Sequence, residues 1–251
     1  MSTEKKKARR SVPIRVKMVV SAGLPVLLII LGMVVFSALR FSSVLSDSGL
    51  EQAALVARER AAVANTYLAG GMQIAEDLAG IASIRGDLPA SLRRSVLSSA
   101  VRAYMETNQD LLAAWYIFEA DVLDGNDLAY AGEDGHLVDG RFAPYWFRAD
   151  GEILLDYATD DEFGAVGDYY SVPLKTGVEY FTEPYSFELK TGEEVWAISF
   201  CVPVIQDGEV IGVAGVDYEL SAIQAFADSF RSGKRYAFIL ASDMSLVAHP
   251  V

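Results

Sequence analysis

The first long apolar run of the chain predicts one helix that crosses a membrane. Residues 18–39 read MVVSAGLPVLLIILGMVVFSAL, which is 22 residues without a charge. A helix of that length extends about 33 Å, enough to span the hydrocarbon core of a bilayer. A cleaved signal peptide has a shorter apolar core and a small-residue cleavage site after it, whereas this run ends in SALRF. We therefore expect an uncleaved anchor.

Beyond the anchor, apolar residues recur three and four positions apart, which predicts long helices over residues 40–110. The first helix continues to about residue 85, and we expect Gly70 and Gly71 to bend it. A second helix follows Asp87, with Pro89 in its first turn. The stalk carries more apolar side chains than one sheet can cover, which predicts a homodimer formed by helix pairing; these side chains include Leu50, Val63 and Tyr67.

From Leu111 the apolar period changes to two, and β-branched and aromatic residues become frequent. Residues 111–120 predict a buried strand. Two antiparallel hairpins are expected, one turning at Asp150-Gly151 and one at Asp207-Gly208. A helix over 220–233, ending at Gly233, precedes the start of a further hairpin. The fold class is therefore α+β, with long helices followed by an antiparallel sheet.

The strand over residues 195–204 alternates large and small side chains. Trp196, Ile198, Phe200, Val202 and Val204 occupy one face, and Val195, Ala197, Ser199 and Cys201 occupy the other. Since successive side chains of a strand point to opposite faces, we expect the first face to pack a core and the second to leave room.

Charge divides the chain into two parts that meet different surroundings. The net charge is -13, yet residues 1–17 carry seven Lys or Arg against Glu4, a balance of +6 that leaves -19 for the rest. The positive-inside rule keeps residues 1–17 in the cytoplasm and places the chain after the anchor outside, in the periplasm of a bacterium. The chain is thus expected in the inner (plasma) membrane. The acidic exterior argues against a nucleic-acid partner.

The sequence contains few residue patterns that would indicate a catalytic, cofactor or metal site. The two histidines, His136 and His249, are far apart, and Cys201 is the single cysteine, so no intrachain disulfide is possible. The sequence contains no H-E-x-x-H, G-x-S-x-G or C-x-x-C motif and no phosphate-binding P-loop. We therefore expect neither an enzyme nor a cofactor. The acidic runs 121–127 and 156–163 offer oxygen ligands for calcium but fit no EF-hand, and solvated loops are the preferred interpretation.

Several motifs together resemble the double Cache sensor domain of bacterial transmembrane receptors, most often methyl-accepting chemotaxis proteins. They are WYIF in the first strand, the Arg-aromatic hairpin GRFAPYWFRADG, the stretch TEPYSFELKTGEEVWAISFCVPVIQDGEVIGVAGVDYEL, and the closing AHP. The resemblance implies two PAS-like modules on a long helix. The expected organisation is a cytoplasmic N-terminus (1–17), a transmembrane helix (18–39), the sensor's long helices (40–110), a membrane-distal module (111–233) and the start of a membrane-proximal module (234–251).

The resemblance also implies a ligand site in the membrane-distal module. In amino-acid-binding members an arginine holds the ligand carboxylate and an aspartate in the GVD strand takes the ammonium; by position these are Arg141 and Asp217. A bidentate contact with a carboxylate would justify a buried guanidinium. Alternatively, Arg141 is a surface side chain or pairs with Asp217 itself. The expected ligand-binding residues are Tyr116, Arg141, Tyr145, Trp146, Tyr170, Tyr185 and Asp217.

The spacing around Arg141 bears on the class of ligand. The family's amino-acid motif has one residue between the arginine and a tryptophan, whereas four residues separate Arg141 from Trp146. On a regular strand Trp146 then points away from the face that Arg141 shares with Tyr145. This spacing argues against specificity for α-amino acids and favours a more general small organic ligand. If Arg141 and Asp217 face one cavity, we expect that ligand to carry an anionic group, as a carboxylate or an amino acid does, with a cationic or hydrogen-bond-donating group opposite.

Two classes of function stay open at this stage. The first is the ligand-binding region of a receptor that signals across the membrane, for chemotaxis or as the sensor of a histidine kinase or a cyclic-dinucleotide enzyme. Contact with cytoplasmic signalling partners would then need a C-terminal part beyond Val251, which suggests that the chain is a fragment. The second is a membrane-anchored periplasmic enzyme or scaffold.

Overall fold

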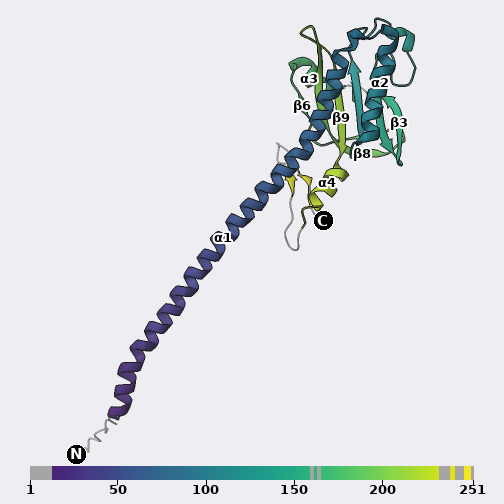
Figure 1. The fold of residues 1–251 in the computed structure, drawn as a ribbon. Helices are drawn as coiled ribbons and strands as arrows, with labels where there is room; N and C mark the ends of the chain where they lie inside the picture. Colours follow the sequence, from purple (N-terminus) through teal and green to yellow (C-terminus); the bar gives the residue numbers. More distant parts are fainter. Residues whose placement is uncertain (1–12, 159–160, 163–164, 232–237, 241–245, 250–251) are drawn as a thin grey trace, which may run out of the picture. The chain divides into compact units, whose positions relative to one another are not determined.

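The structure is a computed structural model that describes residues 13–158, 161–162, 165–231, 238–240 and 246–249 (Figure 1). It divides into two compact units, Met1–Glu59 and Arg60–Val251. Helix α1 (Ile14–Ser83) begins in the first unit and ends in the second.

The first unit is helical over its described residues. Its segment Ile14–Phe41 has a mean hydropathy of 2.7 and, among the described helices, is the one long and apolar enough to cross a membrane. Apolar side chains that the structure describes there, such as Leu27 and Phe36, are exposed. The predicted span over 18–39 lies inside this segment.

The second unit is α+β, as the sequence predicts. After α1 it contains η1 (Arg85–Asp87), α2 (Ala90–Thr107), β1 (Ala113–Phe118), η2 (Asp127–Tyr130), β2 (Pro144–Ala149), β3 (Glu152–Tyr157), β4 (Asp161–Glu162), β5 (Ala165–Val166), α3 (Asp168–Thr176), β6 (Tyr180–Phe181), β7 (Tyr185–Glu188), β8 (Glu194–Gln206), β9 (Glu209–Glu219), α4 (Leu220–Asp228), β10 (Ile239–Leu240) and β11 (Leu246–Ala248).

One antiparallel sheet organises this unit. Its strand order is β3-β2-β1-β9-β8-β6, and β7 also pairs with β8. β1 lies between the two predicted hairpins and pairs with a strand of each. Residues far apart in the sequence thereby become neighbours: Ala113 lies opposite Asp217, and Trp115 lies opposite Tyr145 on one side and Gly215 on the other. This register brings the candidate site together.

Both predicted Asp-Gly hairpins are confirmed. β2 pairs with β3 and β8 with β9. Asp150 and Gly151 have φ values of 50° and 80°, and Asp207 and Gly208 have 53° and 87°. Two consecutive residues with positive φ make the tight turn that matches strand twist, and Asp-Gly tolerates it best.

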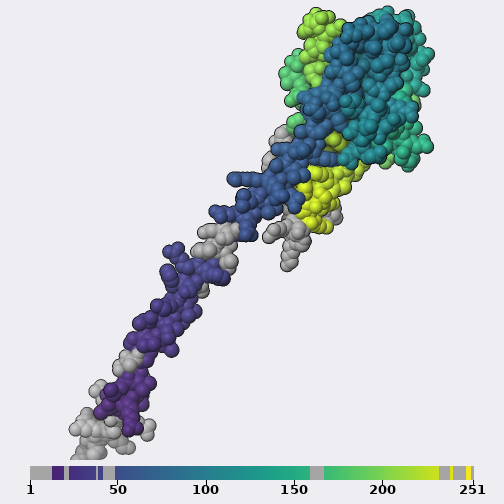
Figure 2. Space-filling view, in the orientation of Figure 1, coloured from purple at the N-terminus to yellow at the C-terminus, as the bar shows by residue number. Residues whose placement is uncertain are grey.

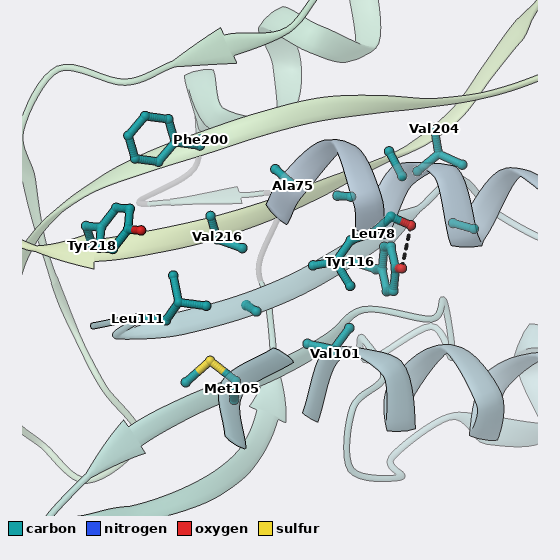
Figure 3. Close-up of a cluster of buried hydrophobic side chains, with 14 of the residues drawn as sticks. Ala75, Leu78, Val101, Met105, Leu111, Tyr116, Phe200, Val204, Val216 and Tyr218 are labelled. Carbon is teal, nitrogen blue, oxygen red and sulfur yellow. Dashed lines mark hydrogen bonds between the residues drawn. The ribbon is translucent and has the colours of Figure 1, made fainter. Parts of the chain in front are cut away.

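The end of α1 and α2 cover one face of the sheet, where they form the main core. Figure 2 shows the two helices in blue and teal over this side of the second unit. Figure 3 shows the core they bury against the sheet, in which the phenol of Tyr116 donates a 2.6 Å hydrogen bond to the carbonyl of Leu78 inside α1. The larger members of this cluster include Leu97, Val101, Met105, Phe200 and Tyr218. The predicted large face of β8 is thus confirmed as a core face, although Trp196 at its start is 53% exposed.

The prediction of a bend at the two stalk glycines was wrong, because α1 continues through both. Gly71 has a packing role instead. A Cβ at this position would lie 2.5 Å from a ring carbon of Tyr218 and 2.7 Å from one of Phe200, whereas a Cβ at Gly70 would meet nothing within 4 Å. Gly71 therefore lets two aromatic rings of the sheet contact the backbone of the helix.

The predicted helix after residue 220 is shorter than expected, since α4 ends at Asp228, and Gly233 lies outside the described residues. β10 and β11 then pair antiparallel, which agrees with the expected start of a further hairpin. In α2 the apolar residues divide between two sides, because Leu97 and Val101 are buried whereas Leu92 and Val96 are exposed.

The two glycines offer a matched pair of substitutions. Gly71→Ala should lower the free energy of unfolding by about 1–3 kcal/mol, because the added methyl overlaps the rings of Phe200 and Tyr218. Gly70→Ala should raise it by up to about 1 kcal/mol through better helix propensity. Denaturant unfolding of the chain in detergent, followed by circular dichroism, measures both. Equal effects of the two substitutions would contradict this packing.

Candidate functional site

A buried carboxylate lies at the centre of the sheet. Asp217 on β9 is 1% exposed. Its Oδ1 accepts hydrogen bonds from the indole Nε1 of Trp115 at 3.0 Å and from the hydroxyl of Ser199 at 2.6 Å. Its Oδ2 accepts one from the phenol of Tyr145 at 3.0 Å. Strands β1, β8 and β2 each supply one donor, because the register places these positions on the same face as Asp217.

The network extends from Ser199 to the edge of the sheet. The phenol of Tyr185 on β7 lies 2.8 Å from the hydroxyl of Ser199. Thr182 binds the backbone of Ser199 twice, through its hydroxyl at 2.9 Å and its backbone amide at 3.0 Å. The position of Asp217 is therefore tied to the connection between β6 and β7.

Gly215 explains how the indole of Trp115 reaches the carboxylate. It lies two residues before Asp217, on the same face of β9, and directly opposite Trp115. A Cβ on Gly215 would lie 2.1 Å from an atom of the indole. Only a residue without a side chain lets the indole lie flat across β9 with its Nε1 on Asp217.

Asp217 lies in the wall of a cavity of about 410 Å³. Aromatic rings make up most of this wall: Trp115, Tyr145, Phe147, Tyr157, Tyr169, Tyr185 and Phe187. The ring of Tyr185 stacks between Tyr169 and Phe187, with centroid distances of 6.0 Å and 5.5 Å. The site is therefore an aromatic box with a carboxylate in one wall.

The charge of the box is negative. Besides Asp217, the lining contains Asp156, Glu188 and Lys190. The ammonium of Lys190 lies 3.2 Å from Asp156, in an ion pair that raises the pKa of Lys190 through its hydrogen bond and its Coulomb attraction. If all four groups are charged, three carboxylates face one ammonium.

Burial controls the titration of the central groups. Desolvation raises the pKa of Asp217 from 3.8 to about 6, although its three hydrogen bonds act in the opposite direction. Desolvation, together with repulsion by Asp217, also raises the pKa values of the Tyr145 and Tyr185 phenols well above 10.0. Both phenols are therefore protonated at neutral pH and act as donors toward anionic partners.

Three of the seven predicted site residues line this cavity, namely Asp217, Tyr145 and Tyr185. Tyr116 and Trp146 belong to the opposite face of the sheet: Tyr116 bonds Leu78 of α1, and the indole of Trp146 donates to the hydroxyl of Ser98 on α2 at 2.9 Å. Strand alternation accounts for both positions, because Tyr116 directly follows Trp115 and Trp146 directly follows Tyr145, and Trp115 and Tyr145 line the cavity.

Tyr170 and Arg141 also lie outside the wall of the cavity. Tyr170 on α3 packs in a core cluster and its phenol donates to Glu119, whereas the preceding Tyr169 lines the cavity. The Nε of Arg141 lies 2.9 Å from Asp139, two residues earlier in the same loop. The idea that Arg141 and Asp217 face one cavity therefore has no support in the geometry of the described residues.

Sequence reasoning missed several cavity residues, including Trp115, Asp156, Tyr169, Phe187 and Lys190. Trp115 lies on the same face as Ala113 and opposite Gly215, but this becomes visible only once β1 is paired with β9, which the sequence does not specify. Tyr169 and Lys190 come from a helix and a turn, whose direction the hydrophobic pattern does not indicate.

The acidic run 121–127 has a structural partner. Asp124 and Asp127 each lie 2.6 Å from the guanidinium of Arg94, which is 6% exposed on α2. The run thus compensates a buried arginine. Within the described residues no group of three or more histidine, cysteine or acidic side chains is arranged to hold a metal ion.

A second, wider hollow of about 700 Å³ lies where β8, β9, α4 and β11 meet. Its wall includes Glu183, Glu194, Trp196 and Gln224. Its lining does not include Asp217 or the residues that donate to it, so the smaller cavity is the better candidate site.

The comparisons with known proteins agree with this fold. Residues 97–225, just over half of the chain, match the family described as methyl-accepting chemotaxis protein-like, first PDC sensor domain. Methyl-accepting chemotaxis protein TlpQ of Pseudomonas aeruginosa is 31% identical over 148 residues, which cover 54% of this chain and 20% of TlpQ. The chain thus spans about a fifth of that curated relative.

Solved sensor domains have the same architecture. The extracellular domain of mmHK1S-Z2, described as a histidine kinase, is 28% identical with a TM-score of 0.62 over 74% of this chain and 66% of that one. Methyl-accepting chemotaxis protein X gives 24% identity and a TM-score of 0.64 over 77% and 72%. The more distant ligand-binding domain of the Campylobacter jejuni chemoreceptor Tlp3, in complex with 4-methylisoleucine, shares the fold at 16% identity and a TM-score of 0.51 over 77% and 66%. The expected resemblance to chemoreceptor Cache domains is confirmed.

The raised pKa of Asp217 predicts a pH-dependent stability. Because this pKa is higher in the folded chain than in the unfolded chain, the stabilising contribution of the protonated form is lost as pH rises from 3.8 to about 6. Between pH 4 and pH 7 the loss should amount to about 2 kcal/mol. Asp217→Asn has no carboxyl group at this position and should lack this pH dependence. The free energy of unfolding of the variant, relative to that of the wild type, should therefore rise by about 2 kcal/mol from pH 4 to pH 7. Urea unfolding at both pH values measures this, and a pH-independent difference would contradict it.

Proposed function

Because the chain belongs to the methyl-accepting chemotaxis protein-like PDC sensor domains, we propose that it is the ligand-binding region of a membrane receptor for a small organic cation. The ligand enters the cavity of Asp217 from outside the cell. Its binding is signalled across the membrane, for chemotaxis. The observation that carries this proposal is a buried carboxylate in a wall of aromatic rings.

The physical case for a cation has two parts. The burial that raises the pKa of Asp217 makes its negative charge costly, and a positive group within contact distance would offset that cost. Aromatic faces attract the same group, by about 0.5–2 kcal/mol for each well-placed ring. Tyr145 and Tyr185 supply such rings next to Asp217. An ammonium group satisfies both requirements at once.

An anion fits the cavity less well. Among the described residues that line the cavity, Lys190 is the one basic side chain, and it is already paired with Asp156. A ligand carboxylate near Asp217 would meet a like charge in a poorly solvated site. Lys190 supports one alternative, an α-amino acid with its ammonium on Asp217 and its carboxylate toward Lys190. Amines with and without a carboxylate therefore distinguish the two ligand classes.

A ligand screen tests this function. Isothermal titration of the chain in detergent with alkylamines, α-amino acids and small carboxylates should give amine binding. Asp217→Asn should weaken it by about 30-fold or more, because a buried charge pair is lost. Arg141→Ala is the matched control and should leave the affinity unchanged, since its guanidinium bonds Asp139 outside the cavity. Carboxylate hits without an amine, or amine affinity that survives Asp217→Asn, would refute the proposal.

The pH dependence of binding gives a second test. Below about pH 6 a proton competes with the ligand cation for Asp217. Amine affinity should therefore be about tenfold weaker at pH 5 than at pH 7. The same titration repeated on Asp217→Asn is the control and should lose this dependence. Affinity independent of pH in the wild type would show that the ligand does not contact the ionised carboxylate.

The receptor proposal includes a membrane orientation and a partner. The basic residues 1–17 stay in the cytoplasm and the sensor unit lies outside. Pairing of α1 in a homodimer accounts for exposed apolar residues such as Leu50 and Val63, whereas Tyr67 packs on Phe226 instead. The output is a chemotaxis transmitter; a histidine kinase is the alternative, because the similar solved domains include one from a protein so described.

A topology reporter tests the orientation. Alkaline phosphatase folds to its active form only in an oxidising compartment. Fused after Arg231, it should therefore be active in cells, and a cytoplasmic reporter such as β-galactosidase at the same position should be inactive. The opposite pattern would overturn the orientation and, with it, the proposal of an external ligand.

A further inference from the structure

Asp217 and its three direct donors, Trp115, Tyr145 and Ser199, share a pattern that binding alone does not require. Each is followed in sequence by an aromatic residue on the opposite face of the sheet, because neighbouring side chains of a strand point in opposite directions. The four pairs are Trp115 and Tyr116 on β1, Tyr145 and Trp146 on β2, Ser199 and Phe200 on β8, and Asp217 and Tyr218 on β9.

These four aromatic residues contact the helices that cover the sheet. Tyr116 donates to the carbonyl of Leu78 in α1, and Trp146 donates to Ser98 in α2. The rings of Phe200 and Tyr218 lie so close to Gly71 that no Cβ fits between them and the helix. Figure 3 shows Phe200, Tyr218 and Tyr116 on the core side of their strands, with Tyr116 bonded to α1.

Strands β8 and β9 make the tightest of these connections. Ser199 and Asp217 are direct cross-strand neighbours joined by a 2.6 Å hydrogen bond on the cavity face. On the helix face, the following residues Phe200 and Tyr218 meet edge to face, with centroids 5.6 Å apart and planes at 87°. One peptide group separates Ser199 from Phe200 and Asp217 from Tyr218, so each residue of the hydrogen bond directly precedes a ring that contacts α1. A shift of the network must therefore move both rings against Gly71.

The network is placed so that a ligand would disturb it. Among the described residues, one donor reaches the Oδ2 of Asp217, namely Tyr145, whose ring lines the cavity. A positive group that contacts Asp217 from the cavity must share Oδ2 with this phenol or displace it. The strain then falls on β2 and β9, which carry Trp146 and Tyr218 on their other face.

We propose that these paired positions couple the cavity to the helices, and that the contact of Phe200 and Tyr218 with Gly71 is the point at which the state of the Asp217 network sets the packing of α1. Tyr116, Phe200 and Tyr218 are thus positioning residues for α1 rather than ordinary core, and Trp146 has the same role for α2. α1 is also the helix that contains the apolar segment Ile14–Phe41. The coupling concerns the state of Asp217 and applies to any ligand that alters it.

Hydrogen–deuterium exchange on the full chain in detergent tests this coupling without a ligand, so its failure is distinguishable from failure of the proposed function. Ser199→Ala removes one donor from Asp217. It should speed exchange of peptides from residues 64–83 by about 2- to 10-fold, the effect of losing roughly one hydrogen bond. Peptides from residues 121–143 contain neither Asp217 nor any of its three donors, so their exchange rates should stay unchanged.

Asp156→Asn is the matched control, because Asp156 lines the same cavity but gives no hydrogen bond to Asp217 and lies on β3. It should leave exchange in 64–83 unchanged. If Ser199→Ala does not fold, Asp217→Asn replaces it and must alter exchange in 64–83 selectively. Unchanged exchange in 64–83, an equal rise in 64–83 and 121–143, or an equal response to Asp156→Asn would overturn the coupling.

Discussion

The structure depends on holding one carboxylate, that of Asp217, inside an antiparallel sheet. A buried carboxylate is unstable unless it is protonated, hydrogen-bonded or paired with a cation. Three donors from three neighbouring strands meet part of this requirement, and the pKa of Asp217, raised to about 6 by burial, shows that they do not meet all of it. In the proposed function a ligand cation supplies the rest, so the constraint that shapes the strands would also favour a positively charged ligand.

Much of the scaffold could be predicted because it follows from local rules. The Asp-Gly turns require positive φ at two residues, and period-two alternation separates a core face from a face with small side chains. The same alternation correctly placed Trp146 away from Tyr145. The importance of Asp217 could also be inferred, since a carboxylate within the apolar run VIGVAGVDY needs a partner.

The features that could not be predicted depend on which strands pair, on where a loop places its side chains and on how closely a helix packs on the sheet. The pairing of β1 with β9 makes Trp115 a donor to Asp217, and no local pattern specifies which strand lies beside β1. Arg141 matched the family's binding position by order along the chain, yet its loop places the guanidinium on Asp139. Gly71 was expected to bend the helix because the sequence indicates only the local flexibility of a glycine. Its close contact with the rings of Phe200 and Tyr218 depends on the tertiary structure.

The central claim is that Asp217 meets the positive group of a ligand, and a titration of its carboxyl carbon by NMR is the most direct measurement. In the ligand-free chain the ¹³Cγ resonance of Asp217 should titrate near pH 6. With a saturating alkylamine the midpoint should fall by about one unit or more, because the cation stabilises the ionised form. A midpoint that stays the same when the amine binds would place the ligand elsewhere and contradict the account.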